Sequence, residues 1–378
     1  MSIRVSVGLY VHVPFCARKC AYCDFNSYAS MDELIEPYVR ALRWEMEQRS
    51  REVGQVATIY IGGGTPSHLP QGSLENVLCQ VFQVFDVDGD AEITVEANPA
   101  DLDIRRMRAL RNAGVNRVSI GAQSFDDGVL RFLGRRHDAN QARRAVEIAR
   151  AAGFENVSID LIYAVPGQSP GMWRQTLEEA LALCPDHISA YSLTIEPGTP
   201  LGDLVQRGLV APVDNDTEAE MYEIARGMLE AAGYEHYEIS NFARAGFSCR
   251  HNQTYWQDND YVGVGAGAHS YLNGVRWWNV KHPEAYVRMV RGGTLPVAGA
   301  EHLSRDEQLR EALVLALRTR DGVVVEALEQ RFGRELWQSH RKKIIGEMEN
   351  GLLCIRDGRL ALVRDAFVIA DAVCEALV

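Results

Sequence analysis

The 378-residue sequence has no long basic block and no apolar run approaching the ~18 residues that a membrane-spanning helix needs. Its formal net charge is -12. Phosphate contacts require clustered lysine and arginine, so no nucleic acid is expected as a partner. The N-terminal stretch also has no apolar core of signal-peptide length and no Ala-x-Ala cleavage site, which predicts a cytoplasmic location. With 47% hydrophobic and 24% charged residues, the composition is that of a globular protein.

Cysteine is scarce as well, and eight cysteines in a long intracellular chain favour metal binding over disulfides. Cys16, Cys20 and Cys23 form a C-x3-C-x2-C cluster. Three thiolates can hold three irons of a cubane [4Fe-4S] cluster and leave one iron open to a ligand. A zinc site and three core cysteines are the alternatives, but zinc prefers four ligands and no fourth lies nearby. Four other cysteines have apolar or helical surroundings and are expected to be inert core residues: Cys79, Cys184, Cys354 and Cys374.

Short apolar runs alternate with helical patterns along the first 235 residues, which predicts a parallel sheet with right-handed crossovers. Six repeats are too few for a closed eight-stranded barrel, so the expected fold class is α/β, with an open, partial (βα)6 barrel. The expected strands are Val5–Val13, Thr58–Ile61, Ile93–Glu96, Arg117–Ile120, Val157–Ile162 and His187–Leu193. The expected helices are 32–51, 73–85, 103–113, 139–152, 172–183 and 216–232.

Polar groups fall at the C-terminal ends of these strands, where barrels of this kind collect their chemistry. Gly62, Gly63 and Gly64 remove every Cβ over three residues, so backbone amides can approach a ligand closely. An ordinary βα turn is the alternative meaning of such a triplet. Further polar side chains at strand ends are Glu96, Asn98, Gln123 and Asp160.

The residue composition changes in the last third of the chain. Residues 236–290 are dense in aromatic residues, histidine and glycine, and are expected to connect the barrel domain, 1–235, to a C-terminal domain, 291–378. The alternation at Gly263, Gly265 and Gly267 lacks the frame of a dinucleotide-binding loop, which favours a small-residue strand or loop at the open side of the barrel. The C-terminal domain is expected to be winged-helix-like, with helices at 304–318, 324–332 and 335–350 and a hairpin at 352–363 that turns at Asp357-Gly358.

The cysteine cluster, with Tyr22 before its last cysteine, resembles the signature of the radical S-adenosylmethionine (SAM) superfamily. Phe25 stands where the oxygen-independent coproporphyrinogen III dehydrogenases carry a further cysteine, and C-x3-C-x2-C-x-F is similar to their relatives, the HemW heme chaperones. The resemblance implies a [4Fe-4S] cluster and SAM. The neighbouring Arg136 competes with Arg135 for its role, and His12 and His137 are expected to be structural histidines rather than ligands. The implied SAM contacts are Tyr10, Tyr22, Gly63, Gly64, Thr65, Glu96, Gln123, Arg135 and Asp160.

A second motif, His251-Asn-x-x-Tyr-Trp256, places an imidazole among aromatic rings that can ligate heme iron and pack on the porphyrin. A core histidine at a domain interface is the alternative. The motif is similar to one of the heme chaperone group, which implies that His251 binds heme. Cys249 and Cys184, the latter followed by proline, are weaker candidates for a thiolate ligand.

Two functions follow from the resemblance. The first is a chaperone that binds heme, the cluster and SAM and hands heme to an acceptor protein, such as a membrane respiratory hemoprotein. The second is an enzyme, a coproporphyrinogen III dehydrogenase. Phe25, the short lead-in of 15 residues before Cys16 and the His251 motif favour the chaperone, whereas the complete set of SAM contacts keeps radical chemistry open. Relatives also imply a homodimer and peripheral membrane association.

Overall fold

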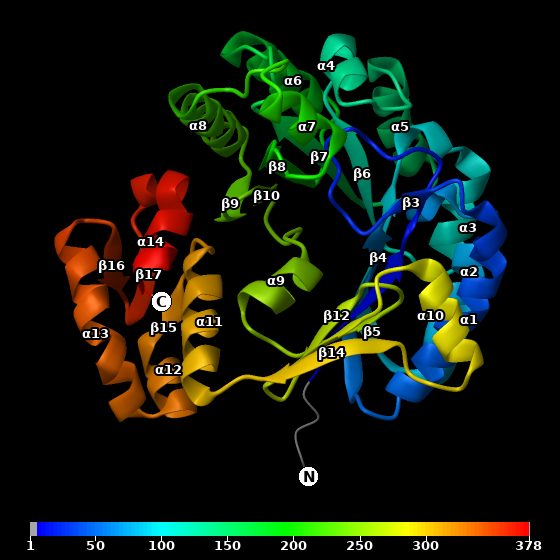
Figure 1. The fold of residues 1–378 in the computed structure, drawn as a ribbon. Coiled ribbons are helices and arrows are strands. Elements are labelled where there is room, and N and C mark those ends of the chain that lie inside the picture. Colours follow the sequence, from blue (N-terminus) through cyan, green and yellow to red (C-terminus); the bar gives the residue numbers. More distant parts are fainter. Residues whose placement is uncertain (1–5, 378) are drawn as a thin grey trace.

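A computed structural model describes residues 6–377 of the chain (Figure 1). Val5, the first residue of the first expected strand, lies outside this range. Within it, no helix is long and apolar enough to cross a membrane.

The N-terminal half is the expected partial barrel. Six parallel strands lie side by side in the order β1-β4-β5-β6-β7-β8, and helices connect them across the outer face (Figure 1). The strands are β1 Val7–Val13, β4 Gln55–Gly63, β5 Asp86–Ala97, β6 Arg117–Gln123, β7 Asn156–Tyr163 and β8 His187–Ser192. The connecting helices are α1 Ile35–Arg49, α2 Ser73–Val84, α3 Ile104–Asn112, α4 Asp127–Phe132, α5 Ala139–Ala151 and α6 Pro170–Ala182. Short elements complete the loops: β2 Phe15–Cys16, β3 Tyr28–Ala29, η1 Asp32–Leu34, η2 Pro66–His68 and η3 Pro99–Asp101.

Local sequence explains where these helices begin and which face they bury. Asp138 and Gln141 form a reciprocal capping box at the start of α5. Ser169 caps α6, and Pro170 occupies its first turn, where no backbone donor is needed. The buried side of α5 carries small apolar residues at helical spacing, which lets the helix lie close to the sheet: Ala142, Ala145, Val146 and Ala149.

The sheet does not close, and further strands extend it at both edges; each is antiparallel to its inner neighbour except β11, which is parallel to β1. Beyond β8 lie β10 Asn241–Ala243 and β9 Glu235–Glu238; beyond β1 lie β11 Tyr261–Val264, β12 His269–Leu272, β13 Val275–Asn279 and β14 Val297–His302. Strand β11 pairs in parallel with β1 and contains Gly263, whereas Gly265 and Gly267 lie in the turn that follows it. A Cβ at Gly263 would lie 2.2 Å from the His269 carbonyl oxygen, so only glycine permits this strand approach. Three helices accompany these strands: α8 Asn215–Ala231, α9 Arg250–Trp256 and α10 Pro283–Arg291.

The C-terminal part combines helices with a small three-stranded sheet, ordered β15-β17-β16. Asp357 and Gly358 both have positive φ, 50° and 75°, as a type I′ hairpin turn requires. The elements are α11 Arg305–Leu317, β15 Val323–Val324, α12 Val325–Phe332, α13 Arg334–Glu349, β16 Leu353–Arg356, β17 Arg359–Leu362, η4 Arg364–Ile369 and α14 Ala370–Leu377.

One further helix, α7 Pro200–Gln206, lies outside this part and follows the last barrel strand, β8.

The isolated cysteines divide between core and surface. Cys374 is buried, as expected, but Cys79 and Cys184 are exposed and Cys354 is partly exposed. The expectation of a core position was therefore wrong for Cys79 and Cys184, because an apolar sequence neighbourhood does not determine which face of an element a residue occupies.

Candidate functional site

A cavity of about 490 Å³ lies at the C-terminal ends of the barrel strands, between the cysteine loop and the glycine turn. It is lined by every residue predicted for the cluster and SAM except Tyr10: Cys16, Cys20, Tyr22, Cys23, Gly63, Gly64, Thr65, Glu96, Gln123, Arg135 and Asp160. Tyr10 lies behind this lining, where its hydroxyl is 3.0 Å from His12 Nδ1 and its ring stacks on Tyr60.

The three cysteines project from the loop after β1. Cys16 is buried, and Cys20 and Cys23 are partly exposed. Hydrogen-bond donors approach two of the sulfurs: Thr65 Oγ1 lies 3.3 Å from Cys16 Sγ, and an Arg135 guanidinium nitrogen lies 3.6 Å from Cys20 Sγ. Such donors stabilise negative charge on sulfur, so the surroundings suit thiolate ligands of a cluster. Within residues 6–377, no three His, Cys, Asp or Glu side chains are grouped to hold a single metal ion.

The glycine turn is dictated by close packing. Gly63 has φ of 114°, and a Cβ there would lie 2.5 Å from His12 Cε1. A Cβ at Gly62 would lie 2.9 Å from Glu96 Cδ. The Gly63 amide donates to Glu96 Oε2 at 3.1 Å. Glycine therefore lets the backbone approach both the imidazole behind the turn and the carboxylate beside it.

Two half-buried carboxyl groups face the cavity. Glu96 Oε1 accepts from the Tyr60 hydroxyl at 2.8 Å, and burial raises the pKa of Glu96 to about 7. The Ser119 hydroxyl lies 3.0 and 3.1 Å from the two oxygens of Asp160, whose pKa burial also raises. A carboxyl group held in this way can accept hydrogen bonds from hydroxyl or amino groups of a ligand.

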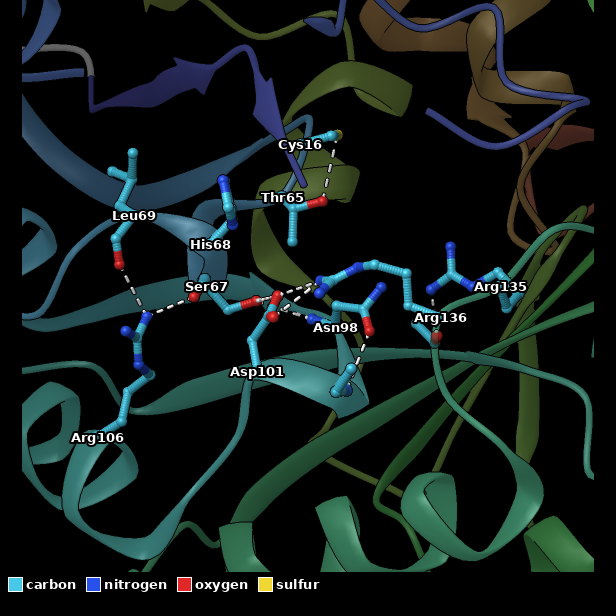
Figure 2. Close-up of polar contacts among 12 residues, drawn as sticks. Cys16, Thr65, Ser67, His68, Leu69, Asn98, Asp101, Arg106, Arg135 and Arg136 are labelled. Atoms are coloured by element: carbon cyan, nitrogen blue, oxygen red, sulfur yellow. Dashed lines mark hydrogen bonds and ion pairs between the residues drawn. The ribbon is translucent and has the colours of Figure 1, made fainter. Parts of the chain in front are cut away.

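Arg135 and Arg136 have different surroundings (Figure 2). Arg136 donates to both carboxylate oxygens of Asp101, at 2.8 and 2.7 Å. Arg135 instead donates to the Gly121 carbonyl at 2.7 Å and reaches Cys20. Since Arg136 is already neutralised by a bidentate pair, Arg135 is the arginine better placed to meet a ligand carboxylate beside the cluster.

Figure 2 also shows what fixes the turn that follows Thr65. The Ser67 hydroxyl donates to Asp101 Oδ2 at 3.2 Å and accepts from the Asn98 amide at 2.9 Å. Arg106 donates to the carbonyls of Ser67 and Leu69. These bonds connect the first helical turn after β4 to the end of β5, so the glycine turn has a rigid support.

His251 lies behind the cavity lining rather than in it. Its Nδ1 is 2.8 Å from the Thr58 hydroxyl and its Nε2 is 2.9 Å from the Tyr255 hydroxyl, with 1% of the residue exposed. Burial lowers its pKa to about 3. Cys249 is also buried; its Sγ donates to Glu92 at 3.5 Å, and burial raises its pKa to about 12. Both ring nitrogens of His251 and the thiol of Cys249 thus have protein partners here, and the assignment of His251 to heme stays a prediction.

Several cavity residues had not been predicted from the sequence: Tyr60, Arg117, Ser119, Ser189, Tyr191 and Asn252. Most lie on barrel strands at alternate positions that share a face with a predicted residue, as Ser119 does with Gln123. That period of two was visible in the sequence. Asn252 could not be found in this way, because it reaches the cavity from α9, more than fifty residues beyond β8.

Comparisons with known proteins agree with this geometry. Residues 10–180 match the Radical SAM superfamily, and residues 303–369 match the HemN C-terminal domain. The chain is 40% identical to a protein of Mycobacterium tuberculosis named heme chaperone HemW, over 98% of this chain and 94% of the relative. It is 39% identical to the Bacillus subtilis protein of the same name, over 86% and 87%.

Among solved structures, the chain is similar to the coproporphyrinogen III oxidase HemN of Escherichia coli, described as a radical SAM enzyme. The TM-score is 0.87 over 99% of this chain and 90% of that chain, at 23% identity. This likeness supports the fold, a radical SAM α/β barrel with a C-terminal domain. The identity to the two bacterial relatives, which extends over most of each chain, supports a narrower assignment, and the chain belongs to the HemW family of the radical SAM superfamily.

Proposed function

We propose that this protein is a heme chaperone: it binds heme, a [4Fe-4S] cluster and SAM, and it transfers the heme to an acceptor protein. The observation that carries the proposal is the 40% identity to the HemW heme chaperone over nearly the whole of both chains. The cavity adds support, because the chemistry of its lining fits the two cofactors.

Cys16, Cys20 and Cys23 would hold three irons of the cluster, with Thr65 and Arg135 donating toward its sulfur ligands. The cluster with SAM supplies one-electron chemistry when both are bound. This chain's own residues orient the SAM: the Gly63–Gly64 backbone admits its amino acid portion, and Arg135 is placed to pair with its carboxylate. Glu96 and Asp160 would accept hydrogen bonds from its amino and ribose groups, and Tyr10 supports the lining from behind.

The alternative is a coproporphyrinogen III dehydrogenase. One observation favours it: the cavity keeps all the polar groups needed to hold SAM beside the cysteines, although heme binding by itself does not require SAM. Phe25 opposes it. This residue, which is 65% exposed at the cavity, stands in the place of the further cysteine of the dehydrogenases.

The acceptor of the heme is proposed to be a membrane respiratory hemoprotein, reached by peripheral association of this protein with the membrane, and the chaperone is proposed to act as a homodimer in the cytoplasm. The acidic overall charge requires that contact with an anionic membrane be made through the acceptor or a local patch.

Two parallel anaerobic assays test the proposal on reconstituted protein. One supplies SAM, a reductant and coproporphyrinogen III and measures protoporphyrinogen; the other titrates heme and follows its visible absorption. The proposal predicts stoichiometric heme binding without protoporphyrinogen at turnover. Multiple turnovers to protoporphyrinogen would support the dehydrogenase instead.

A further inference from the structure

Arg117 lines the cluster–SAM cavity, and the proposed function gives it no role. It is the first residue of β6, and only 1% of it is exposed. Its Nε and Nη1 have no hydrogen-bond partner among residues 6–377. A guanidinium group keeps its charge in a protein interior, and burying that charge is costly unless other groups offset it. The surroundings of Arg117 should therefore contain groups that use its charge.

The register of the sheet places Arg117 between the strands that carry the two carboxyl groups of the cavity. On one side it pairs with Thr94 on β5, which lies two positions before Glu96 on the same face of the strand. Two positions after Arg117 on β6, the Ser119 hydroxyl donates to both oxygens of Asp160 on the other neighbour, β7. Arg117, Glu96 and Asp160 all line the same cavity.

The hydrogen bonds that hold these two carboxyl groups come from neutral donors. Glu96 accepts from a tyrosine hydroxyl and a backbone amide, and Asp160 accepts from a serine hydroxyl. Such bonds orient the carboxyl oxygens without bringing a positive charge to them. Burial raises the pKa of both groups, and the charge of Arg117 opposes that rise.

Other charged or titratable side chains also face this part of the cavity. Those around the carboxyl groups are Arg135, Tyr10 on β1, Tyr60 on β4, Tyr191 on β8 and Tyr255 on α9. Those around Arg117 are Glu92, Tyr60, His187, Tyr237, Cys249 and His251.

Neither of the two other ions in this set replaces Arg117. Arg135 donates to the Gly121 carbonyl and reaches Cys20, so its guanidinium is already engaged beside the cysteines. Glu92 accepts from the backbone amides at the start of α9, which occupies its oxygens away from the cavity lining. The phenols are neutral near pH 7.

We propose that Arg117 is a positioning residue of the SAM site, whose guanidinium keeps Glu96 and Asp160 ionised so that they bind the cationic amino group and the ribose hydroxyls of SAM. Arg117 acts through these two carboxyl groups. The inference rests on the SAM site of the proposed function and adds a residue behind it. A carboxylate binds a cation more strongly than a neutral carboxyl group does, so the effect of Arg117 depends on pH.

The test measures SAM affinity by anaerobic equilibrium dialysis from about pH 5.5 to 8.5, on proteins matched in cluster iron content. Arg117→Gln removes the charge and keeps a polar side chain, whereas Arg117→Lys keeps the charge. Arg49→Gln is the matched control. Arg49 is 5% exposed, also has guanidinium nitrogens without a partner among the described residues, and stacks on Trp277 outside the cavity lining.

The inference predicts that wild-type affinity rises with pH and levels off above about pH 7, where Glu96 is ionised. Arg117→Gln should lower the affinity at pH 7 by about tenfold and move the midpoint of the profile upward by about one unit. Arg117→Lys should keep the wild-type midpoint, and Arg49→Gln should keep the whole profile. The amino group of SAM titrates alike in every sample, so a difference between variants comes from the protein.

A merely structural role of Arg117 gives a different result. Arg117→Gln would then bind SAM less tightly by the same factor at every pH, with an unmoved midpoint, and this outcome would overturn the inference. If Arg117→Gln does not fold, Arg117→Lys decides: the wild-type midpoint supports the inference, and a midpoint moved by about one unit refutes it. If wild-type protein that carries its cluster binds no SAM at any pH, the proposed SAM site fails, and the inference fails with it.

Discussion

The imidazole of His251, on α9, lies 2.8 Å from the hydroxyl of Thr58, on β4. This contact, with the one from His251 to Tyr255, fastens α9 to the barrel and places the neighbouring Asn252 in the cavity lining. Glu92 strengthens the attachment, because its carboxylate accepts from the backbone amides of Arg250 and His251 at the start of α9. In this structure His251 therefore fixes the position of α9.

Replacing His251 by alanine should lower stability by about 2–4 kcal/mol, because the hydroxyls of Thr58 and Tyr255 would lose their partner in a buried place. Thermal unfolding monitored by circular dichroism measures the loss. Tyr255→Phe and the double variant complete a cycle, in which the two losses should not add. Full stability combined with loss of heme binding would instead show that His251 is a ligand.

Gly63 should tolerate no Cβ. Gly63→Ala is expected to destabilise the turn by more than the ~1 kcal/mol that positive φ alone costs a non-glycine residue, and to lower SAM affinity at least tenfold, because His12 must move. Gly72→Ala is the matched control, since Gly72 also has positive φ, at 90°, but has no atom within 4 Å of the added Cβ. Anaerobic equilibrium dialysis with labelled SAM measures the affinity, and equal effects of the two substitutions would refute the steric explanation.

Alanine substitutions at Arg135 and Arg136 should affect SAM affinity differently. Arg135→Ala is expected to reduce SAM affinity at least tenfold, since the group beside Cys20 is lost. Arg136→Ala should change that affinity less than about threefold and act mainly through Asp101, which would lose its bidentate partner. The same dialysis measurement decides between them; the opposite ranking would mean that the neighbouring arginine holds the SAM carboxylate.

Glu96 should give the cofactor-free protein a pH-dependent stability. Because burial raises the pKa of Glu96 to about 7, the folded state keeps this proton over a range in which the unfolded carboxyl, with a pKa near 4.5, has lost it. The contribution of Glu96 to stability is therefore complete below about pH 4.5 and is lost as the pH rises toward 7 and above.

Glu96→Gln cannot ionise, so it isolates this effect from all other titrating groups. The thermal midpoint of the wild type minus that of Glu96→Gln should fall steadily between pH 5 and pH 8. A difference that stays constant over this range would show that Glu96 has an ordinary pKa.

The barrel and most of the cavity lining could be predicted because their signals are local. Apolar runs that alternate with amphipathic helices identify the strands, and the polar residue at each strand end, such as Glu96 or Asp160, must then meet its neighbours at one end of a parallel sheet. The cysteine cluster and the glycine triplet could likewise be recognised from the short segments that contain them.

The features that could not be predicted depend on contacts between residues that are far apart in the sequence. No local signal shows that the His251 imidazole is buried against Thr58, because this contact joins residues that are 193 positions apart and forms only when α9 packs on β4. The exposure of Cys79 and Cys184 depends likewise on which helix or loop face turns outward.

The rate of heme transfer tests the chaperone function most directly. Heme-loaded protein would be mixed with increasing amounts of the apo form of a respiratory hemoprotein in vesicles, and the spectrum of the acceptor would be followed in time. Directed transfer predicts a rate that rises with acceptor concentration and exceeds the release of heme to excess apomyoglobin. A rate that does not change with acceptor concentration and equals that release would contradict the chaperone function.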